Sequence, residues 1–129
     1  MLRRPIIIIV ALCINIEQAG RILFSNPHSI VLNYGMAFST FQDMPTLATV
    51  LSGIACMMVM SVFFSELNEW ERFGYSLMLG GALSNFSEKI ILGYVIDWIP
   101  LPFIPLVINI ADIEVSLGAL IAFVGFMTQ

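Results

Sequence analysis

Four long apolar runs alternate with short polar or turn-forming segments along the chain. They cover about residues 5–24, 47–64, 73–96 and 106–127. A helix that crosses a bilayer needs roughly 20 mostly apolar residues, within a range of about 17–25. Each run therefore has the length of a membrane span. We expect a membrane all-α fold in which residues 1–129 form a single integral membrane domain, built as a four-transmembrane-helix bundle.

The segment 25–46 does not follow this pattern. Turn-forming "SNPH" opens it and "QDMP" closes it, and "SIVLNYGMAFSTF" between them is rich in β-branched and aromatic residues. We expect a small extended or β-like segment, or a short hairpin, rather than a span. The connection 97–105 contains three prolines, so it is not expected to be a regular helix.

Basic residues predict the orientation of the spans. Arg3 and Arg4 precede the first run and Arg72 lies between the second and third, whereas 25–46 and 97–105 contain no Lys or Arg. Short loops that carry Lys and Arg stay in the cytoplasm. We therefore expect a multi-pass protein with both termini cytoplasmic and with the segments 25–46 and 97–105 on the outer side.

Composition agrees with a membrane protein and excludes other classes. The chain is 59% hydrophobic and 11% charged, against about 25% charged in soluble domains. Its five Lys and Arg residues form no basic patch, so nucleic acid is not an expected partner. Cys13 and Cys56 fall inside apolar runs, and no Cys/His spacing indicates a metal site. No metal and no cofactor is expected.

Several polar residues interrupt the apolar runs or border them. They are Glu17, Arg21, Asn85, Glu88, Lys89, Asp97, Asn109 and Asp112. At a rise of about 1.5 Å per residue, the third-run residues lie roughly 11–17 Å below Ile96, and the others also fall in the outer half of their runs. Ionisable residues are costly in a bilayer and mark functional sites by default. We expect these groups to converge near the outer face.

Structural explanations also exist for the residues of the first and third runs. Glu17 and Arg21 have the i, i+4 spacing that allows an ion pair on one helix. Asn85 and Glu88 have the i, i+3 spacing of a shared helix face, from which Lys89 is turned away, and could form hydrogen bonds between helices. These alternatives involve no chemistry.

Asp97 and Asp112 allow a joint explanation. Taken singly, each could be an interfacial carboxylate, and Asp112 could be favoured by a helix dipole. Taken together, two carboxylates can share one proton: one removes a proton from water while the other donates to the carbonyl under attack. This is the chemistry of an aspartic protease, which uses neither a metal nor a serine or cysteine nucleophile.

Four segments carry a resemblance to a known family. They are "NYGMAFS" (33–39), "GGALSNFSEK" (80–89), "GYVIDW" (93–98) and "NIAD" (109–112). In this order they are similar to the motifs of bacterial lipoprotein signal peptidases, also called signal peptidase II, which are intramembrane aspartyl proteases with four transmembrane helices. The resemblance extends over most of the chain, and the combination of the four segments is more specific than any single one.

The resemblance implies roles for particular residues. Asp97 and Asp112 would be catalytic, and Asn33, Asn85 and Asn109 would orient the substrate backbone or the dyad. The remaining candidates for substrate binding or support are Glu17, Arg21, Gly35, Phe38, Glu88, Lys89 and Ala111. The resemblance also places segment 25–46 at the membrane surface over the active site.

The same resemblance implies a substrate and a location. The family substrate is a prolipoprotein whose cysteine carries a diacylglyceryl group, and the enzyme cuts just before that cysteine. The protein would lie in the bacterial cytoplasmic (inner) membrane, in contact with the lipid bilayer, with its active site near the outer face. A bundle with its polar groups inside can work as a monomer.

Some positions depart from the family motifs. The family usually has Asp where this chain has Glu17, and Lys where it has Arg21. Glu88 and Lys89 stand in place of Asp and Arg, and Ser84 in place of glycine. The sign of each charge is kept while length and geometry change. A divergent paralogue without full catalytic activity is therefore one alternative.

Two other classes of membrane protein share part of this pattern. Small dimeric four-helix multidrug transporters, which are proton-coupled, have a glutamate in the first span, as Glu17 would be. Such an exporter has no need for Asp97, Asp112 or the long outer segment, and replacing Glu17 with Gln should abolish its transport. A non-enzymatic membrane scaffold would tolerate replacement of both aspartates.

Overall fold

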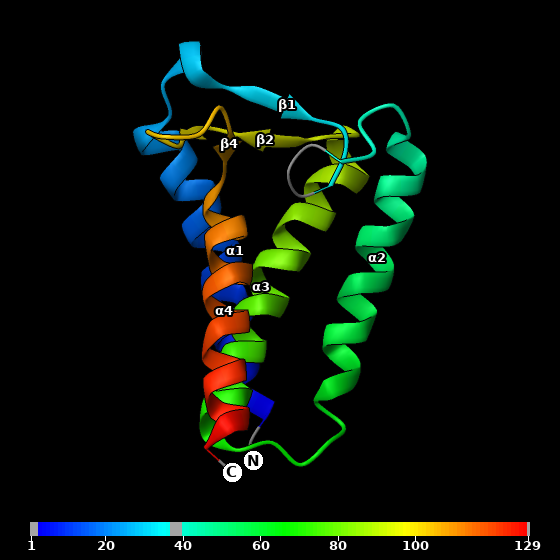
Figure 1. The fold of residues 1–129 in the computed structure, drawn as a ribbon, viewed down its shortest axis with the longest axis vertical. Helices are drawn as coiled ribbons and strands as arrows, with labels where there is room; N and C mark the ends of the chain where they lie inside the picture. Colours follow the sequence, from blue (N-terminus) through cyan, green and yellow to red (C-terminus); the bar gives the residue numbers. More distant parts are fainter. Residues whose placement is uncertain (1–2, 37–39, 129) are drawn as a thin grey trace.

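The computed structural model describes residues 3–36 and 40–128. Within these residues the chain is mostly helical, with α1 (Arg3–Phe24), α2 (Pro45–Val62), α3 (Glu69–Leu92) and α4 (Ile110–Met127) running along one axis (Figure 1). Short strands lie across one end: β1 (Val31–Asn33), β2 (Val95–Asp97), β3 (Ile99–Pro100) and β4 (Val107–Ile108), with the 3-10 turn η1 (Pro27–Ser29). α1 begins and α4 ends at the opposite end.

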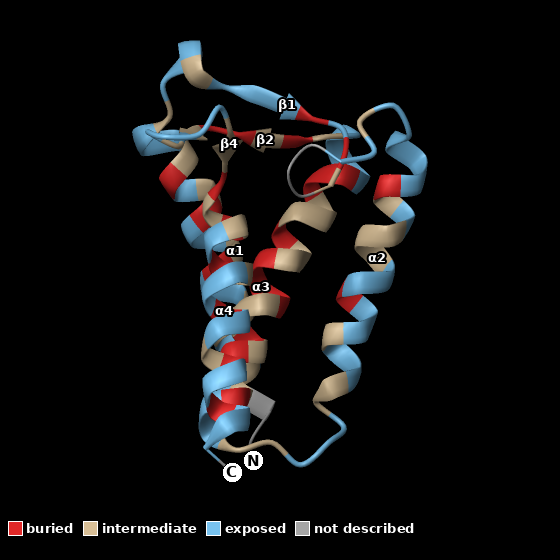
Figure 2. Ribbon diagram, viewed as in Figure 1, coloured by how far each residue is buried: buried red, intermediate tan, exposed pale blue. Residues whose placement is uncertain are grey.

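Three of the described helices are long and apolar enough to cross a membrane. These are α1 from Pro5 onward, α2 and α4, and only 11–28% of the residues in their apolar stretches are buried within the protein. Figure 2 shows their outward faces as exposed. Apolar faces of this extent are stable only against lipid or another apolar partner. The length, composition and exposure of these three helices therefore agree with the spans expected from the sequence.

α3 is the central helix and packs against each of the other three. Its expected range was 73–96, but it begins earlier because the Asn68 side chain and Glu71 form a capping box. It also ends earlier, at Leu92, because Gly93 adopts a left-handed conformation with φ of 84°. Glu88 is thus about 6 Å from the helix end, at 1.5 Å per residue, so the depth estimated from Ile96 was too large.

Glycines allow α3 and α4 to pack closely. A Cβ added at Gly74 would lie 2.6 Å from the Gly118 carbonyl oxygen, and one added at Gly118 would lie 2.7 Å from the Met78 backbone nitrogen. Such distances are too short for a real Cβ, so only glycine permits this approach of the two backbones. The close contact brings the beginning of α4 beside the last turns of α3.

The strands connect segments that are distant in sequence. β1 pairs with β2 in antiparallel register, with Val31 opposite Asp97 and Asn33 opposite Val95. Thus the extended part of segment 25–46 pairs with the chain after α3, not with itself as a hairpin would. β3 and β4 form a separate antiparallel pair, so the described helix of the last run begins at Ile110 rather than at 106.

Candidate active site

Asp97 lies at the end of β2, not at the end of a helix as expected. It is two residues beyond Val95, the partner of Asn33, so Asp97 and Asn33 lie diagonally on the same face of the strand pair. Asn33 Nδ2 donates to Asp97 Oδ2 at 3.0 Å. Asn33 Oδ1 accepts from the Gly35 amide at 2.9 Å and from Gln42 Nε2 at 2.8 Å. The turn after β1 therefore fixes the amide that binds Asp97.

Asp112 lies in the first turn of α4, where it also caps the helix. The Asp112 amide donates to Asn109 Oδ1 at 2.9 Å, and the Asn109 amide donates to Asp112 Oδ2 at 3.1 Å. This reciprocal capping box satisfies backbone donors that a helix start leaves free. The carboxylate is held in place by backbone geometry rather than by a flexible contact.

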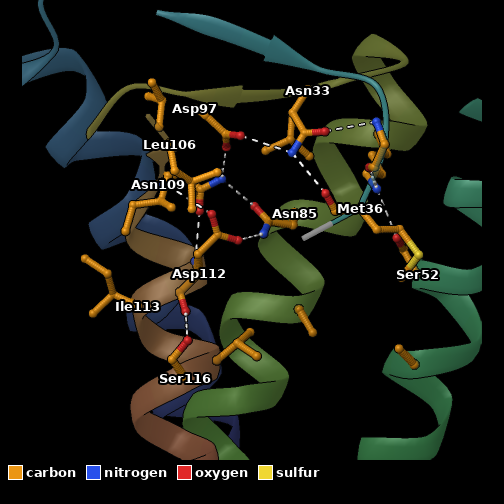
Figure 3. Close-up of a pocket in the computed structure, with 18 of the residues that line it drawn as sticks. Asn33, Met36, Ser52, Asn85, Asp97, Leu106, Asn109, Asp112, Ile113 and Ser116 are labelled. Carbon is orange, nitrogen blue, oxygen red and sulfur yellow. Dashed lines mark hydrogen bonds between the residues drawn. The ribbon is translucent and has the colours of Figure 1, made fainter. Parts of the chain in front are cut away.

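Two asparagine amides link the aspartates. Asn109 Nδ2 donates to Asp97 Oδ1 at 2.8 Å and to Asn85 Oδ1 at 3.0 Å, and Asn85 Nδ2 donates to Asp112 Oδ1 at 3.0 Å. Figure 3 shows this chain of side chains from β2, α3 and α4. Each aspartate oxygen thus accepts a bond from a neutral amide or backbone N–H, and none of these bonds involves a cation.

Asp97 differs from Asp112 in its exposure and lies outside the helices. Asp97 is buried, with 4% of its surface exposed, whereas Asp112 is partly exposed. Burial and the nearby Asp112 charge raise the pKa of Asp97 to about 7, against the opposing hydrogen bonds from Asn33 and Asn109. A carboxyl with this pKa can carry a proton near neutral pH, as a proton-sharing pair requires.

A second set of contacts binds the residues next to both aspartates to Glu17 of α1. Glu17 Oε1 accepts from the indole Nε1 of Trp98 at 3.0 Å, and Glu17 Oε2 accepts from the Ala111 amide at 3.0 Å. Trp98 follows Asp97 and Ala111 precedes Asp112 in the chain. A single buried carboxylate on α1 therefore binds the side chain of the residue after Asp97 and the backbone of the residue before Asp112.

The ion pair expected between Glu17 and Arg21 does not form in the structure. Arg21 instead pairs with Glu88 of α3, and Glu88 also accepts from the Ile96 amide at 3.0 Å. The buried donors around Glu17 come from distant segments and use both of its oxygens. Arg21 and Glu88 consequently join α1 to α3 and to the strand that carries Asp97.

Lys89 links α3 to two other segments at the edge of the site. Its ammonium group donates to the Gly35 carbonyl oxygen and, at 3.1 Å, to Ser52 Oγ on α2. Asn85 and Glu88 do not share the helix face that borders the cavity, although their spacing allowed it. Asn85 and Lys89, four residues apart, line the same cavity, while Glu88 points to α1.

A cavity of about 660 Å³ opens beside the aspartates. Its polar wall includes Asp97, Asp112 and the asparagine amides, as seen in Figure 3. Its remaining wall is mostly apolar and continues along α4 past Ser116 to Leu120. The arrangement can hold an extended polar backbone near the carboxylates together with an apolar group along the helices.

Most of the residues singled out from the sequence meet at this end of the bundle. Phe38 lies outside the described residues. The sequence reasoning missed Trp98, Gln42 and Ser52 as polar partners. For Trp98 a signal was available, because a buried indole N–H usually finds an acceptor.

Comparisons with known proteins identify relatives of the whole core. The family model described as "Signal peptidase (SPase) II" matches residues 7–128. A lipoprotein signal peptidase of Acaryochloris marina is 41% identical over 91 residues, covering 68% of this chain and 54% of the relative. One of Caldicellulosiruptor bescii is 33% identical, covering 70% and 60%. The matched part thus spans little more than half the length of these relatives.

Solved structures show the same fold. A bacterial membrane enzyme determined in meso at 2.3 Å resolution superposes with a TM-score of 0.83 at 19% identity, covering 99% of this chain and 90% of the other. A second, at 1.9 Å, gives a TM-score of 0.79 over 98% and 94%. These structures show the fold, and the match of the family model over residues 7–128 establishes that the chain belongs to the signal peptidase II family.

Proposed function

We propose that this protein is an intramembrane aspartic endopeptidase that removes signal peptides from prolipoproteins. The observation that carries the proposal is the chain of amide hydrogen bonds that joins Asp97 to Asp112 through Asn109 and Asn85. It places two carboxyl groups from separate elements on one cavity wall. Membership in the signal peptidase II family supplies the class of substrate.

The proposed mechanism uses one proton shared by the dyad. A charged carboxylate removes a proton from water, whose oxygen attacks the scissile carbonyl carbon. The protonated carboxyl donates to the carbonyl oxygen, and a tetrahedral intermediate forms. Its collapse breaks the C–N bond, returns a proton to the leaving nitrogen and restores the shared proton. Asp97, with its raised pKa, is suited to hold that proton in the resting enzyme.

The shape and polarity of the cavity agree with a lipidated substrate. The polar end can bind the peptide around the cut, which we place just before a diacylglyceryl-modified cysteine. The apolar wall along α4, which includes Leu117 and Leu120, can contact the acyl chains. Asn33, Asn85 and Asn109 would position the dyad, and Gly35, Lys89 and Ala111 the backbone around it.

The membrane topology belongs to the same proposal. α3 has 24 residues, which corresponds to about 36 Å at 1.5 Å per residue. Its charged residues in the last turns, Glu88 and Lys89, are buried against other segments rather than exposed. We infer that α3 also crosses the membrane, which brings the number of spans to four. Both termini are then cytoplasmic, and the strands lie at the outer face of the inner membrane. One copy contains the complete dyad, so a monomer would suffice.

The proposal is tested by cleavage of a diacylglyceryl-modified prolipoprotein with purified protein in detergent. Wild type should cut before the lipidated cysteine, and Asp97→Asn and Asp112→Asn should each be folded and inactive. Asn15→Ala, at an exposed position of α1, is the matched control and should cut normally. Equal cleavage by wild type and both aspartate variants would show that the dyad is not catalytic.

A further inference from the structure

The connection between β3 and β4 exposes an apolar surface that the proposed reaction does not use. Phe103 is 95% exposed and Ile104 is 60% exposed, with Pro102 and Pro105 exposed on either side. The residues from Trp98 to Ala111 include no charged side chain. We refer to residues 102–105 as the hairpin tip. Leaving apolar surface in water, rather than burying it, costs about 25 cal/mol of free energy per Å².

The neighbouring end of α1 extends this apolar surface. Ile22, Leu23 and Phe24 are 71–80% exposed. Figure 1 shows the β3–β4 connection at the level where α1 ends. Gly20 of α1 faces Trp98, the residue before β3: a Cβ added at Gly20 would lie 3.4 Å from the Trp98 ring. The exposed tip and the exposed apolar end of α1 therefore lie at the same level of the molecule, and α1 is apolar enough to span a membrane.

The other side of the same hairpin faces the candidate active site. Leu101 and Leu106 line the cavity, and Leu101 donates its amide to the Leu106 carbonyl oxygen at 2.9 Å. The hairpin also starts two residues after Asp97 and ends next to Asn109. We call Leu101 and Leu106 the cavity roof. Binding of the hairpin tip to the bilayer would therefore also fix the position of the cavity roof relative to the bilayer.

We propose that the hairpin tip inserts into the lipid leaflet next to the dyad and anchors the cavity roof to the membrane. The partner is the acyl and headgroup boundary of the bilayer, because the tip is apolar, uncharged and at the same level as the exposed apolar end of α1. Prolines on both sides suit this role, since they restrict the loop's unfolded states and reduce the entropy lost on ordering.

Site-directed spin labelling tests this proposal independently of catalysis. Phe103→Cys and, separately, Ile104→Cys are labelled in the full chain, which is reconstituted in phosphatidylcholine–phosphatidylglycerol liposomes. Unsubstituted protein, whose Cys13 and Cys56 are buried, gives the labelling background. His28→Cys is the matched control, because His28 is exposed in η1 at the same end of the bundle.

The measured quantity is the ratio of collisions with oxygen, which concentrates in lipid, to collisions with a water-soluble nickel chelate. We expect oxygen to dominate at 103 and 104 and the nickel chelate to dominate at 28. Equal access to the nickel chelate at 103, 104 and 28 would overturn the proposal. Dipolar broadening between labels at 103 on different copies would assign the tip to a second copy of the chain, and would overturn it as well.

Discussion

Glu17 and Trp98, 81 positions apart in the chain, are joined by a buried hydrogen bond of 3.0 Å from the indole Nε1 to the Glu17 carboxylate. The second oxygen of Glu17 accepts from the Ala111 amide. α1 thus holds the residue after one aspartate and the residue before the other. The segments that carry the two candidate aspartates are therefore both bound by a helix that contributes neither of them.

Replacing Glu17 with Gln should destabilise the protein and slow cleavage. Glutamine keeps one acceptor oxygen, so its NH2 group would face either the Trp98 or the Ala111 donor. We expect the free energy of unfolding to fall by about 1–3 kcal/mol, the usual cost of leaving a buried donor unsatisfied. Denaturant unfolding in detergent measures this change, with Asn15→Ala as the exposed control on α1.

A double-mutant cycle with Trp98→Phe isolates the contact itself. If the hydrogen bond matters, the destabilisations caused by Glu17→Gln and Trp98→Phe should not add, and the interaction energy should reach about 0.5–3 kcal/mol. Strict additivity would show that Glu17 acts through Ala111 alone.

Cleavage should decrease as the pH rises above about 7. The pKa of Asp97 is about 7, and the mechanism needs a proton on the dyad, so each pH unit above this value should lower the rate by up to about tenfold. The pH profile of kcat/KM on a lipidated substrate measures this, because kcat/KM reports the ionisations of the free enzyme. A rate that stays constant to pH 9 would contradict the assignment of the proton to Asp97.

The stability of the protein should show a related pH dependence. Between its ordinary pKa of 3.8 and about 7, the folded Asp97 retains a proton that the unfolded chain has lost. The folded state then binds more protons, so this contribution to the free energy of unfolding decreases as pH rises from about 4 to 7. Asp97→Asn should remove this part of the slope; an unchanged slope would mean that another group causes it.

Breaking the pair between Arg21 and Glu88 should be costly, and removing both charges should restore part of the loss. Their side chains are 18% and 8% exposed, and loss of one partner from a buried pair costs about 3–5 kcal/mol. We expect Glu88→Gln to lower Tm markedly and Glu88→Gln with Arg21→Gln to lower it less. A double variant as unstable as the sum of the two single variants would exclude the pair.

Lys89→Met should loosen the turn after β1. It keeps the apolar stem but removes the donor to the Gly35 carbonyl and to Ser52. A hydrogen bond from a charged group contributes about 1.5–3 kcal/mol, so the amides of Gly35 and Met36 should exchange about ten- to a hundredfold faster. Hydrogen exchange in detergent measures this. Ser52→Ala, which leaves the Gly35 bond intact, should have a smaller effect.

Local sequence features predicted several elements correctly and missed their ends where side chains cap them. The apolar runs indicated membrane-spanning helices because this signal depends on composition over about 20 residues. The end of α3 was misplaced because Gly93, one residue in the left-handed conformation, outweighed the apolar residues that follow it. A cap is a single-residue signal inside a long apolar pattern.

The sequence by itself determined the apolar helices, the family motifs and the two aspartates as a candidate pair. Only the tertiary structure decided which partners each polar group has. The i, i+4 spacing of Glu17 and Arg21 predicted a pair, yet Trp98, Ala111 and Glu88 supply their partners from distant segments. The reason is physical: inside a bundle, every buried donor and acceptor must be satisfied, and the groups that satisfy it are chosen by packing and strand register, not by spacing along the chain.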